Sequence, residues 1–300
     1  MDFSSPRRFP SSTAAPVVAV HCSASSAHQW DGYRSLLDPE VPFITPQLSG
    51  YGTRSPWPNG KPVTLEEEAE RILGTFPQEP ADLVGHSYGG VVAVQLALMA
   101  SQRVRSLVLY EPVLFQLLQQ DSGSALQAEE IGGVARRLAM LSLSGCNRDA
   151  AALFVDYWSV PGTWAGMPRL RQDAVAALMP KVRAEFEAIF HSSMRLAAFR
   201  DMRIPVRVLC GDRSPGPSRR IAELLKVHLP CAQVTILQGA GHMAPLAEPG
   251  ALAPLLFPFA LRSHSSPEAS TIQPWNLRSA GMDTGNVSAR RDASINGLSA

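Results

Sequence analysis

The 300-residue sequence predicts an α/β domain in which helices flank a mainly parallel β-sheet and a helical cap is inserted. Two observations predict this class. Short apolar, β-branched runs alternate with longer helical patterns, as in parallel sheets whose faces are covered by helices. Between Glu111 and Arg203 the strand-like runs stop and helical patterns remain, which indicates a helical insertion over the edge of the sheet.

Six candidate strands are bounded by Pro, Gly or polar turn residues. They cover residues 16–21, 41–47, 81–85, 104–110, 205–210 and 233–237. A helix is expected to start after Thr64, because its hydroxyl can cap the first N–H groups and the acidic Glu66 and Glu67 suit the positive end of the helix dipole. This helix is expected to run to about Phe76, and the next one to begin near Tyr88.

The cap is expected to span about residues 113–203, inserted into a core formed by residues 16–112 and 204–262. Its helical patterns cover residues 129–141, 149–157 and 170–190. An aromatic cluster lies within it, composed of Phe154, Tyr157, Trp158 and Trp164. These rings could line an apolar substrate cavity. Aromatic residues at helical spacing usually pack inside, however, so we favour the interpretation that they hold the cap on the core.

Composition and charge exclude several classes of function. The net charge of +1 without a dense basic run gives no general attraction to nucleic acid. The N-terminal residues lack the apolar stretch of a secretion signal, and no run of about 18 apolar residues is present to cross a membrane. We therefore expect a cytoplasmic protein whose partner is a small-molecule substrate, and neither nucleic acid nor a membrane. The sequence indicates no oligomeric state.

Residues 1–15 and 263–300 are predicted to be disordered, and the second of these tails is rich in Ser, Ala, Asn, Arg and Gly with little apolar periodicity. Four cysteines lie far apart, namely Cys22, Cys146, Cys210 and Cys231. They show neither CxxC nor CxxH spacing, so reduced thiols are expected, with no disulfide framework and no metal site. Nothing in the sequence indicates a cofactor.

The segment Gly85-His86-Ser87-Tyr88-Gly89-Gly90 predicts a nucleophile elbow. It directly follows an apolar strand and directly precedes a helical run, which places Ser87 on a tight strand-to-helix turn. Gly85 and Gly89 provide the room that such a turn needs two positions either side of the nucleophile. The helix from Tyr88 would aim free N–H groups at the space above Ser87, where negative charge develops during acyl transfer. The alternatives are a glycine-rich strand-to-helix turn without a catalytic role and a phosphate-binding loop. Against the second, the turn contains no Lys and shows neither GxGxxG nor Walker spacing.

A serine nucleophile on this turn requires a base later in the chain, because the residues follow in the order Ser, Asp or Glu, His. His242 is the expected base, since it lies in a glycine-rich loop just past the last predicted strand. His21 and His86 lie at strand ends within the proposed site, where a structural or polar lining role is expected. The other histidines occupy surface or helix positions, namely His28, His191, His228 and His264.

Two carboxylates could orient the base, because each follows a strand later than Ser87. Glu111 comes after the strand at 104–110, and Asp212 after the strand at 205–210. A carboxylate beside imidazole fixes its tautomer and stabilises the imidazolium, and either side chain could act from its strand end. Each also has a structural alternative. Glu111 could bond backbone donors where the chain leaves the sheet, and Asp212 could be a solvated turn residue.

Several motifs together resemble the α/β-hydrolases that use a serine nucleophile and carry a helical cap, over residues 16–262. They are His21-Cys22-Ser23-Ala24-Ser25, Ser49-Gly50-Tyr51-Gly52-Thr53-Arg54-Ser55, the elbow, Tyr110-Glu111-Pro112 and Gly241-His242. The resemblance implies the α/β-hydrolase fold. It also implies an oxyanion hole formed by the backbone N–H groups of Ser23 and Tyr88.

The sequence departs from the family pattern at two positions. Ser214 stands where the family usually carries the acid after the penultimate strand. Some relatives, including certain haloalkane dehalogenases, place a glutamate where Glu111 falls, so the resemblance favours Glu111 over Asp212. Cys22 replaces the glycine that commonly follows the histidine of the oxyanion loop. It is not expected to be a nucleophile, because no second base or thiolate-stabilising charge stands beside it.

The resemblance implies acyl transfer to water, in which Ser87 attacks a carbonyl, His242 moves the proton and an acyl-enzyme is hydrolysed. A carboxylic ester or a lactone is the expected substrate. The same residues could also serve carbon–carbon bond hydrolysis or the perhydrolysis of cofactor-free haloperoxidases. Two other classes stay open, a small-molecule receptor or signalling protein of this fold and a non-catalytic scaffold.

Overall fold

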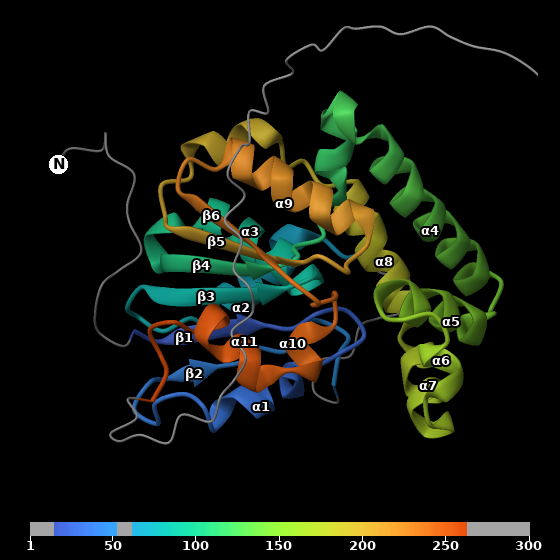
Figure 1. The fold of residues 1–300 in the computed structure, drawn as a ribbon, viewed down its shortest axis with the longest axis horizontal. Helices are drawn as coiled ribbons and strands as arrows, with labels where there is room; N and C mark the ends of the chain where they lie inside the picture. Colours follow the sequence, from blue (N-terminus) through green and yellow to red (C-terminus); the bar gives the residue numbers. More distant parts are fainter. Residues whose placement is uncertain (1–14, 53–61, 263–300) are drawn as a thin grey trace, which may run out of the picture.

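The computed structural model describes residues 15–52 and 62–262, so the predictions of disorder for residues 1–14 and 263–300 lie outside the described residues. A six-stranded sheet in the order β2-β1-β3-β4-β5-β6 forms the centre, and all neighbouring strands are parallel (Figure 1). The strands are β1 (Val17–Val20), β2 (Phe43–Ile44), β3 (Ala81–His86), β4 (Val104–Tyr110), β5 (Val206–Gly211) and β6 (Ala232–Leu237). The predicted fold class is confirmed.

Helices cover both faces of the sheet and one end of it. Those of the core are α1 (Asp31–Arg34), α2 (Leu65–Leu73), α3 (Tyr88–Met99), α9 (Gly216–His228), α10 (Ala244–Ala247) and α11 (Pro249–Leu256). Those between β4 and β5 are α4 (Ala125–Leu143), α5 (Asn147–Trp158), α6 (Thr163–Gly166), α7 (Arg169–Ala177) and α8 (Met179–Phe190). Short 3₁₀ helices are η1 (Ala27–Trp30), η2 (Ser101–Arg103), η3 (Phe115–Gln120), η4 (Ser122–Ser124) and η5 (Leu196–Asp201).

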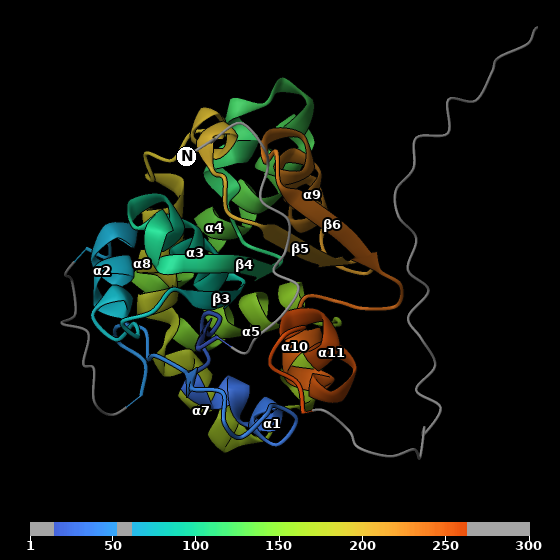
Figure 2. The same cartoon turned by 90° about the vertical axis from the view of Figure 1, so that its left-hand side faces the viewer.

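The strands bury side chains on both faces, because successive residues of a strand point in opposite directions. In β1, Val18 and Val20 belong to the core cluster that includes residues of α2, α3 and α9. Val17 and Ala19 belong to the cluster on the other face, with residues of α1 and α11. Helices α1, α10 and α11 lie together on that second face (Figures 1 and 2). The near-continuous apolar runs of the sequence therefore reflect burial on two sides.

Most differences from the predicted elements are shifts of a few residues at helix ends, but two elements differ more, and proline explains both. The strand expected over residues 41–47 is reduced to the two residues of β2, flanked by Pro42 and Pro46, which have no N–H group to donate to a ladder. The single helix expected over residues 170–190 is broken at Leu178 into α7 and α8. Pro180 causes this break, because it cannot continue a helix from the preceding turn but is well tolerated in the first turn of a new one.

Helices α4 to α8, together called the cap, gather at one end of the sheet (Figure 1). The figure also shows α4 as the longest rod of this group, packed beside α5 and α8. None of the helices within residues 15–52 and 62–262 is long and apolar enough to span a bilayer.

Candidate active site

Ser87 occupies the sharp turn between β3 and α3. Its backbone has φ of 55° and ψ of −119°, a conformation that L-residues rarely adopt and that costs about 1–3 kcal/mol unless the surroundings hold it. The chain passes very close to itself on either side. A Cβ atom on Gly85 would lie 2.6 Å from Cα of Gly90, and one on Gly89 would lie 2.3 Å from the carbonyl oxygen of His21. Only glycine fits at these two positions, and the strained turn lifts Ser87 out of the sheet.

His242 bridges Ser87 and Glu111. Its Nε2 atom lies 3.0 Å from Oγ of Ser87, and its Nδ1 atom lies 2.7 Å from Oε2 of Glu111. All three residues are buried, and Ser87 is the most accessible at 6% exposed. With the Nδ1 proton donated to the carboxylate, Nε2 is left as an acceptor for the serine hydroxyl, which is the tautomer that a general base needs.

Glu111 is held in place by groups at the end of β5. It follows β4 with a left-handed φ of 45°, and its Oε1 atom accepts hydrogen bonds from the backbone N–H of Gly211, at 2.7 Å, and from the hydroxyl of Ser214. Oε2 thereby remains directed at His242. Ser214, which replaces the acid that the family usually carries, thus serves as a donor to the glutamate on the neighbouring strand.

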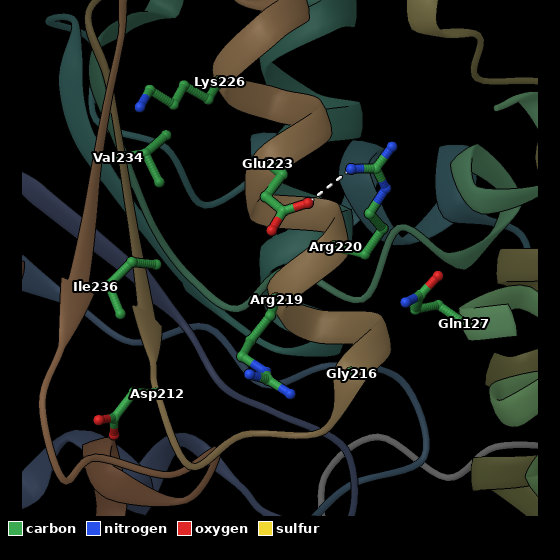
Figure 3. Close-up of a pocket in the computed structure, with 9 residues that line it drawn as sticks. All are labelled: Gln127, Asp212, Gly216, Arg219, Arg220, Glu223, Lys226, Val234 and Ile236. Atoms are coloured by element: carbon green, nitrogen blue, oxygen red, sulfur yellow. Dashed lines mark hydrogen bonds and ion pairs between the residues drawn. The ribbon is translucent and has the colours of Figure 1, made fainter. Parts of the chain in front are cut away.

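The second predicted acid lies elsewhere. The Oδ1 atom of Asp212 accepts a hydrogen bond from the backbone N–H of Gly239 at 2.7 Å. Asp212 also lines a groove of about 460 Å³ between α9 and β6, together with Arg219 and Ile236 (Figure 3). The structure therefore brings Glu111 to His242, and Asp212 fixes the turn that follows β6.

Side chains hold the predicted oxyanion loop in place through hydrogen bonds to its backbone N–H and carbonyl groups. The N–H of Cys22 donates to Oε1 of Gln29 at 3.0 Å, and the carbonyl of Cys22 accepts from Nδ1 of His21 at 2.8 Å. The N–H of Ala24 donates to the hydroxyl of Tyr51 at 3.1 Å. Within the described part of the chain, the N–H of Ser23 has no hydrogen-bond acceptor.

The start of α3 lies against the same loop. The close approach of Gly89 to the carbonyl of His21 puts the first turn of this helix next to the end of β1. Tyr88, the first residue of α3, likewise has a backbone N–H without a partner among the described residues. Ser23 and Tyr88, the two donors that the resemblance assigns to an oxyanion hole, therefore lie on the two segments that meet here, and among the described residues neither N–H has a hydrogen-bond partner.

Two buried histidines support this framework as neutral rings. Burial lowers the pKa of His21 to about 4 and that of His86 well below its ordinary value. The Nδ1 atom of His86 lies 3.1 Å from Nε2 of Gln29, and its Nε2 atom lies 2.9 Å from the carbonyl oxygen of His242. With Nε2 protonated, His86 accepts from Gln29 and donates to His242. Gln29 and His86 thereby join the oxyanion loop to the loop of the base.

Trp158 of α5 packs directly on the base. Its ring centroid lies 4.1 Å from that of His242, and it also stacks on Phe115 at 6.2 Å. The other predicted members of the aromatic cluster pack at the periphery of the core, namely Phe154, Tyr157 and Trp164. Trp158 reaches the site, and both Trp158 and Tyr157 line a cavity beside His242, so this part of the cluster faces a cavity as well as packing on the core.

A cavity of about 510 Å³ reaches His242 from the cap side. Trp158, Tyr157 and Val160 line it from the cap, and Arg213 and Met243 line it from the core. Cys22 is buried, which raises the pKa of its thiol to about 12, so it is a poor source of thiolate. Within residues 15–52 and 62–262, no group of three His, Cys, Asp or Glu side chains is arranged to hold a metal ion.

A buried ionic cluster beside the oxyanion loop was missed from the sequence. Lys181 and Glu185 of α8 form an ion pair at 3.1 Å, and Lys181 forms a second one with Glu68 of α2 at 3.2 Å. All three side chains are at most 3% exposed. Lysine and glutamate four residues apart are typical of a solvated helix face, so their spacing gave no signal of burial.

The sequence pattern of the alpha/beta hydrolase family matches residues 17–255 of the chain. Lipase LipV of Mycobacterium tuberculosis is 32% identical over 111 residues, which cover 36% of this chain and 41% of the lipase. The pimeloyl-[acyl-carrier protein] methyl ester esterase of Yersinia enterocolitica is 24% identical over 258 residues, which cover 83% of this chain and 94% of the esterase.

Solved structures share the architecture. A thermophilic esterase from Thermogutta terrifontis superposes with a TM-score of 0.59 at 22% identity, covering 81% of this chain and 88% of the esterase. At this identity the likeness shows the fold alone. The family match spans the sheet and the cap, together with Ser87, Glu111 and His242. The chain therefore belongs to the alpha/beta hydrolase family.

Proposed function

We propose that the protein is a serine hydrolase that cleaves a small carboxylic ester or lactone. The observation that carries this proposal is the chain of hydrogen bonds from Ser87 through His242 to Glu111. The strained turn lifts the hydroxyl out of the sheet, the imidazole stands within proton-transfer distance of it, and the carboxylate holds the imidazole in the required tautomer. Full-length similarity to a methyl ester esterase supports an ester as the substrate class.

The reaction would begin with attack of Ser87 Oγ on the substrate carbonyl carbon while Nε2 of His242 accepts the hydroxyl proton. The resulting negative charge falls on the former carbonyl oxygen, where the N–H groups of Ser23 and Tyr88 would receive it. Each such donor contributes about 3–4 kcal/mol of transition-state stabilisation. Collapse of the intermediate expels the alcohol, which takes its proton from His242.

Water then completes the cycle. His242 removes a proton from a water molecule as that water attacks the acyl-enzyme, and it returns the proton to Ser87 when the carboxylic acid departs. Glu111 stays ionised throughout and stabilises the imidazolium that forms twice in the cycle. The low exposure of Ser87 and His242 strengthens these charge interactions, because little water screens them.

The lining of the cavity beside His242 indicates what kind of substrate could bind there. The cavity beside His242 is lined partly by aromatic and aliphatic side chains from the cap, which suits an apolar group on a small molecule. We propose a small-molecule substrate and a cytoplasmic location, without nucleic acid or membrane as a partner.

Hydrolysis of p-nitrophenyl esters of increasing acyl length, and of γ- and δ-lactones, tests the proposal on the wild type and Ser87→Ala. The expected result is wild-type turnover that Ser87→Ala abolishes. Turnover that survives in Ser87→Ala would contradict the nucleophile. A folded wild type that neither turns over any of these substrates nor reacts with a fluorophosphonate would contradict the hydrolase assignment and favour a receptor or scaffold.

A further inference from the structure

A carboxylate from the cap reaches into the oxyanion loop. The hydroxyl of Ser23 donates a hydrogen bond of 2.5 Å to Oε2 of Glu185, a residue of α8 that lies 162 positions later in the chain. Glu185 is only 1% exposed. This is the contact through which the cap holds the residue whose backbone N–H is assigned to the oxyanion hole.

The loop needs such support because its next residue is in a rarely populated conformation. Ala24 has a φ of 53°, in the left-handed region that favours glycine. A non-glycine residue stays there only when surrounding contacts fix it. One such contact is the hydrogen bond from the N–H of Ala24 to the hydroxyl of Tyr51, and the other is the anchoring of the neighbouring Ser23 by Glu185.

The charge of Glu185 is accommodated by a neighbour. Burial raises the pKa of Glu185, whereas Lys181 and the hydrogen bond from Ser23 act in the opposite direction. Lys181 also pairs with Glu68, so one ammonium serves two carboxylates. Glu68 contacts a different loop, because its Oε2 atom accepts from the N–H and the hydroxyl of Ser49.

These contacts divide the cluster into two parts. Glu68 and Glu185 are both buried and both paired with Lys181, but only Glu185 bonds the side chain of Ser23. Each carboxylate therefore anchors a loop serine, Glu68 holding Ser49 and Glu185 holding Ser23. The two differ in which loop they hold, because only Ser23 carries a backbone N–H assigned to the oxyanion hole.

We propose that Glu185 is a positioning residue that holds Ser23 so that its backbone N–H points at the developing oxyanion. This inference rests on the proposed hydrolase function and extends it from the core to the cap. Glu185 would act through the Ser23 hydroxyl, since it takes no part in the hydrogen bonds that join Ser87, His242 and Glu111. Its loss is therefore expected to lower kcat while KM changes little, since an oxyanion donor acts mainly in the transition state.

Four variants separate positioning from general stability. Glu185→Leu removes the acceptor and leaves Lys181 paired with Glu68. Because removing one member of a buried ionic cluster is destabilising, the melting temperature of this variant is expected to fall. Glu185→Gln keeps an oxygen that can accept from Ser23. Ser23→Ala removes the donor from the other side and keeps the backbone N–H. Glu68→Gln is the matched control, because it alters the same cluster without touching Ser23.

The measurement is kcat and KM for p-nitrophenyl acetate, with the melting temperature recorded in parallel. We expect Glu185→Leu and Ser23→Ala each to lower kcat about tenfold, a fraction of the effect of deleting an oxyanion donor outright. Glu185→Gln should recover most of the wild-type kcat, and Glu68→Gln should stay within about threefold of it even if its melting temperature falls. The kcat of the double variant Ser23→Ala/Glu185→Leu should fall by no more than about twentyfold relative to wild type, because both changes break the same contact.

Three results would overturn the inference. They are an unchanged kcat in Glu185→Leu, equal losses in Glu185→Gln and Glu185→Leu, and a double variant whose loss is the product of the single losses. If Glu185→Leu fails to fold, an unchanged kcat in Ser23→Ala overturns it instead. If the wild type shows no ester turnover, the rate of fluorophosphonate labelling replaces kcat. A wild type that does neither contradicts the proposed function, and the role of Glu185 with it.

Discussion

The carboxylate of Glu111 lies 2.7 Å from Nδ1 of His242, although 131 positions separate the two residues in the sequence. The contact forms where the end of β4 meets the loop after β6. Two donors on the neighbouring strand end hold the other oxygen of the carboxylate. The orientation of the base thus depends on three adjacent segments of the sheet edge.

Replacing the acid should therefore have a much larger effect at Glu111 than at Asp212. In Glu111→Gln the amide no longer fixes the tautomer or stabilises the imidazolium, and we expect kcat to fall about a thousandfold or more. Asp212→Asn should stay within about threefold of wild type, because its oxygen can still accept from the Gly239 N–H. Ester turnover by the two purified variants checks this. A larger loss in Asp212→Asn would assign the acid to Asp212, and equal losses would contradict the assignment to Glu111.

Ser214→Ala should reveal the support that Glu111 receives. The change removes one of the two donors to Oε1 and leaves the Gly211 N–H in place. A hydrogen bond to a charged group contributes about 1.5–3 kcal/mol, so kcat is expected to fall by about 10-fold to 150-fold if the transition state loses all of it. The measurement is kcat against p-nitrophenyl acetate for Ser214→Ala and, as a conservative comparison, Ser214→Thr, which keeps the hydroxyl. Wild-type kcat in Ser214→Ala would show that Gly211 alone suffices.

Trp158 should affect both stability and turnover, because its ring packs on His242 and on Phe115. Trp158→Ala is expected to lower the free energy of unfolding by about 3 kcal/mol or more through loss of buried aromatic contacts. Trp158→Phe keeps a ring over the imidazole and should retain most of kcat. Urea unfolding and ester kinetics of both variants test this. Equal kcat in the two variants would mean that the ring does not restrain His242.

The neutral His21 makes the fold sensitive to acid. Its pKa is lowered from the ordinary value of 6.5 to about 4 by burial, so between these values the unfolded chain binds a proton that the folded chain does not. Stability contributed by the neutral ring is therefore present above about pH 6.5 and is lost as the pH falls toward 4. His86 acts in the same direction, whereas the raised pKa of Glu185 acts in the opposite one.

A comparison of the wild type with His21→Asn isolates the contribution of His21 to the pH dependence of stability. Urea unfolding of the wild type and of His21→Asn is measured across this pH range. The free energy of unfolding of the wild type should fall more steeply with acid, by up to about 1.4 kcal/mol per pH unit for one proton. Parallel curves would show that His21 titrates normally in the folded protein.

Much of the fold follows from local patterns in the sequence. The boundaries predicted for β3 and β4 agree with the structure to within one residue, because both strands are buried on two faces and end at clear turn signals. The expected N-cap at Thr64 accepts from the N–H of Glu67. The largest errors in the predicted elements are at β2 and at the junction of α7 with α8, where proline acts on the backbone. Periodicity alone does not register a missing N–H group.

The site was predictable only where a local motif carries it. Ser87 and His242 were named from glycine spacing and chain order, and the structure brings them together. The choice between Glu111 and Asp212 could not be made from residues alone, since both follow parallel strands that end at the same edge. Contacts between segments distant in sequence, such as Glu185 with Ser23 or Trp158 with His242, depend on how the cap folds back, and no short pattern encodes that.

The central claim, that Ser87 is a nucleophile activated by His242, is tested most directly by locating a covalent adduct. The folded wild type is treated with a fluorophosphonate, digested and examined by tandem mass spectrometry, with Ser87→Ala and His242→Ala treated in parallel. The account predicts one adduct, on Ser87, which is absent in Ser87→Ala and forms far more slowly in His242→Ala. An unlabelled wild type, or an adduct on another residue, would contradict it.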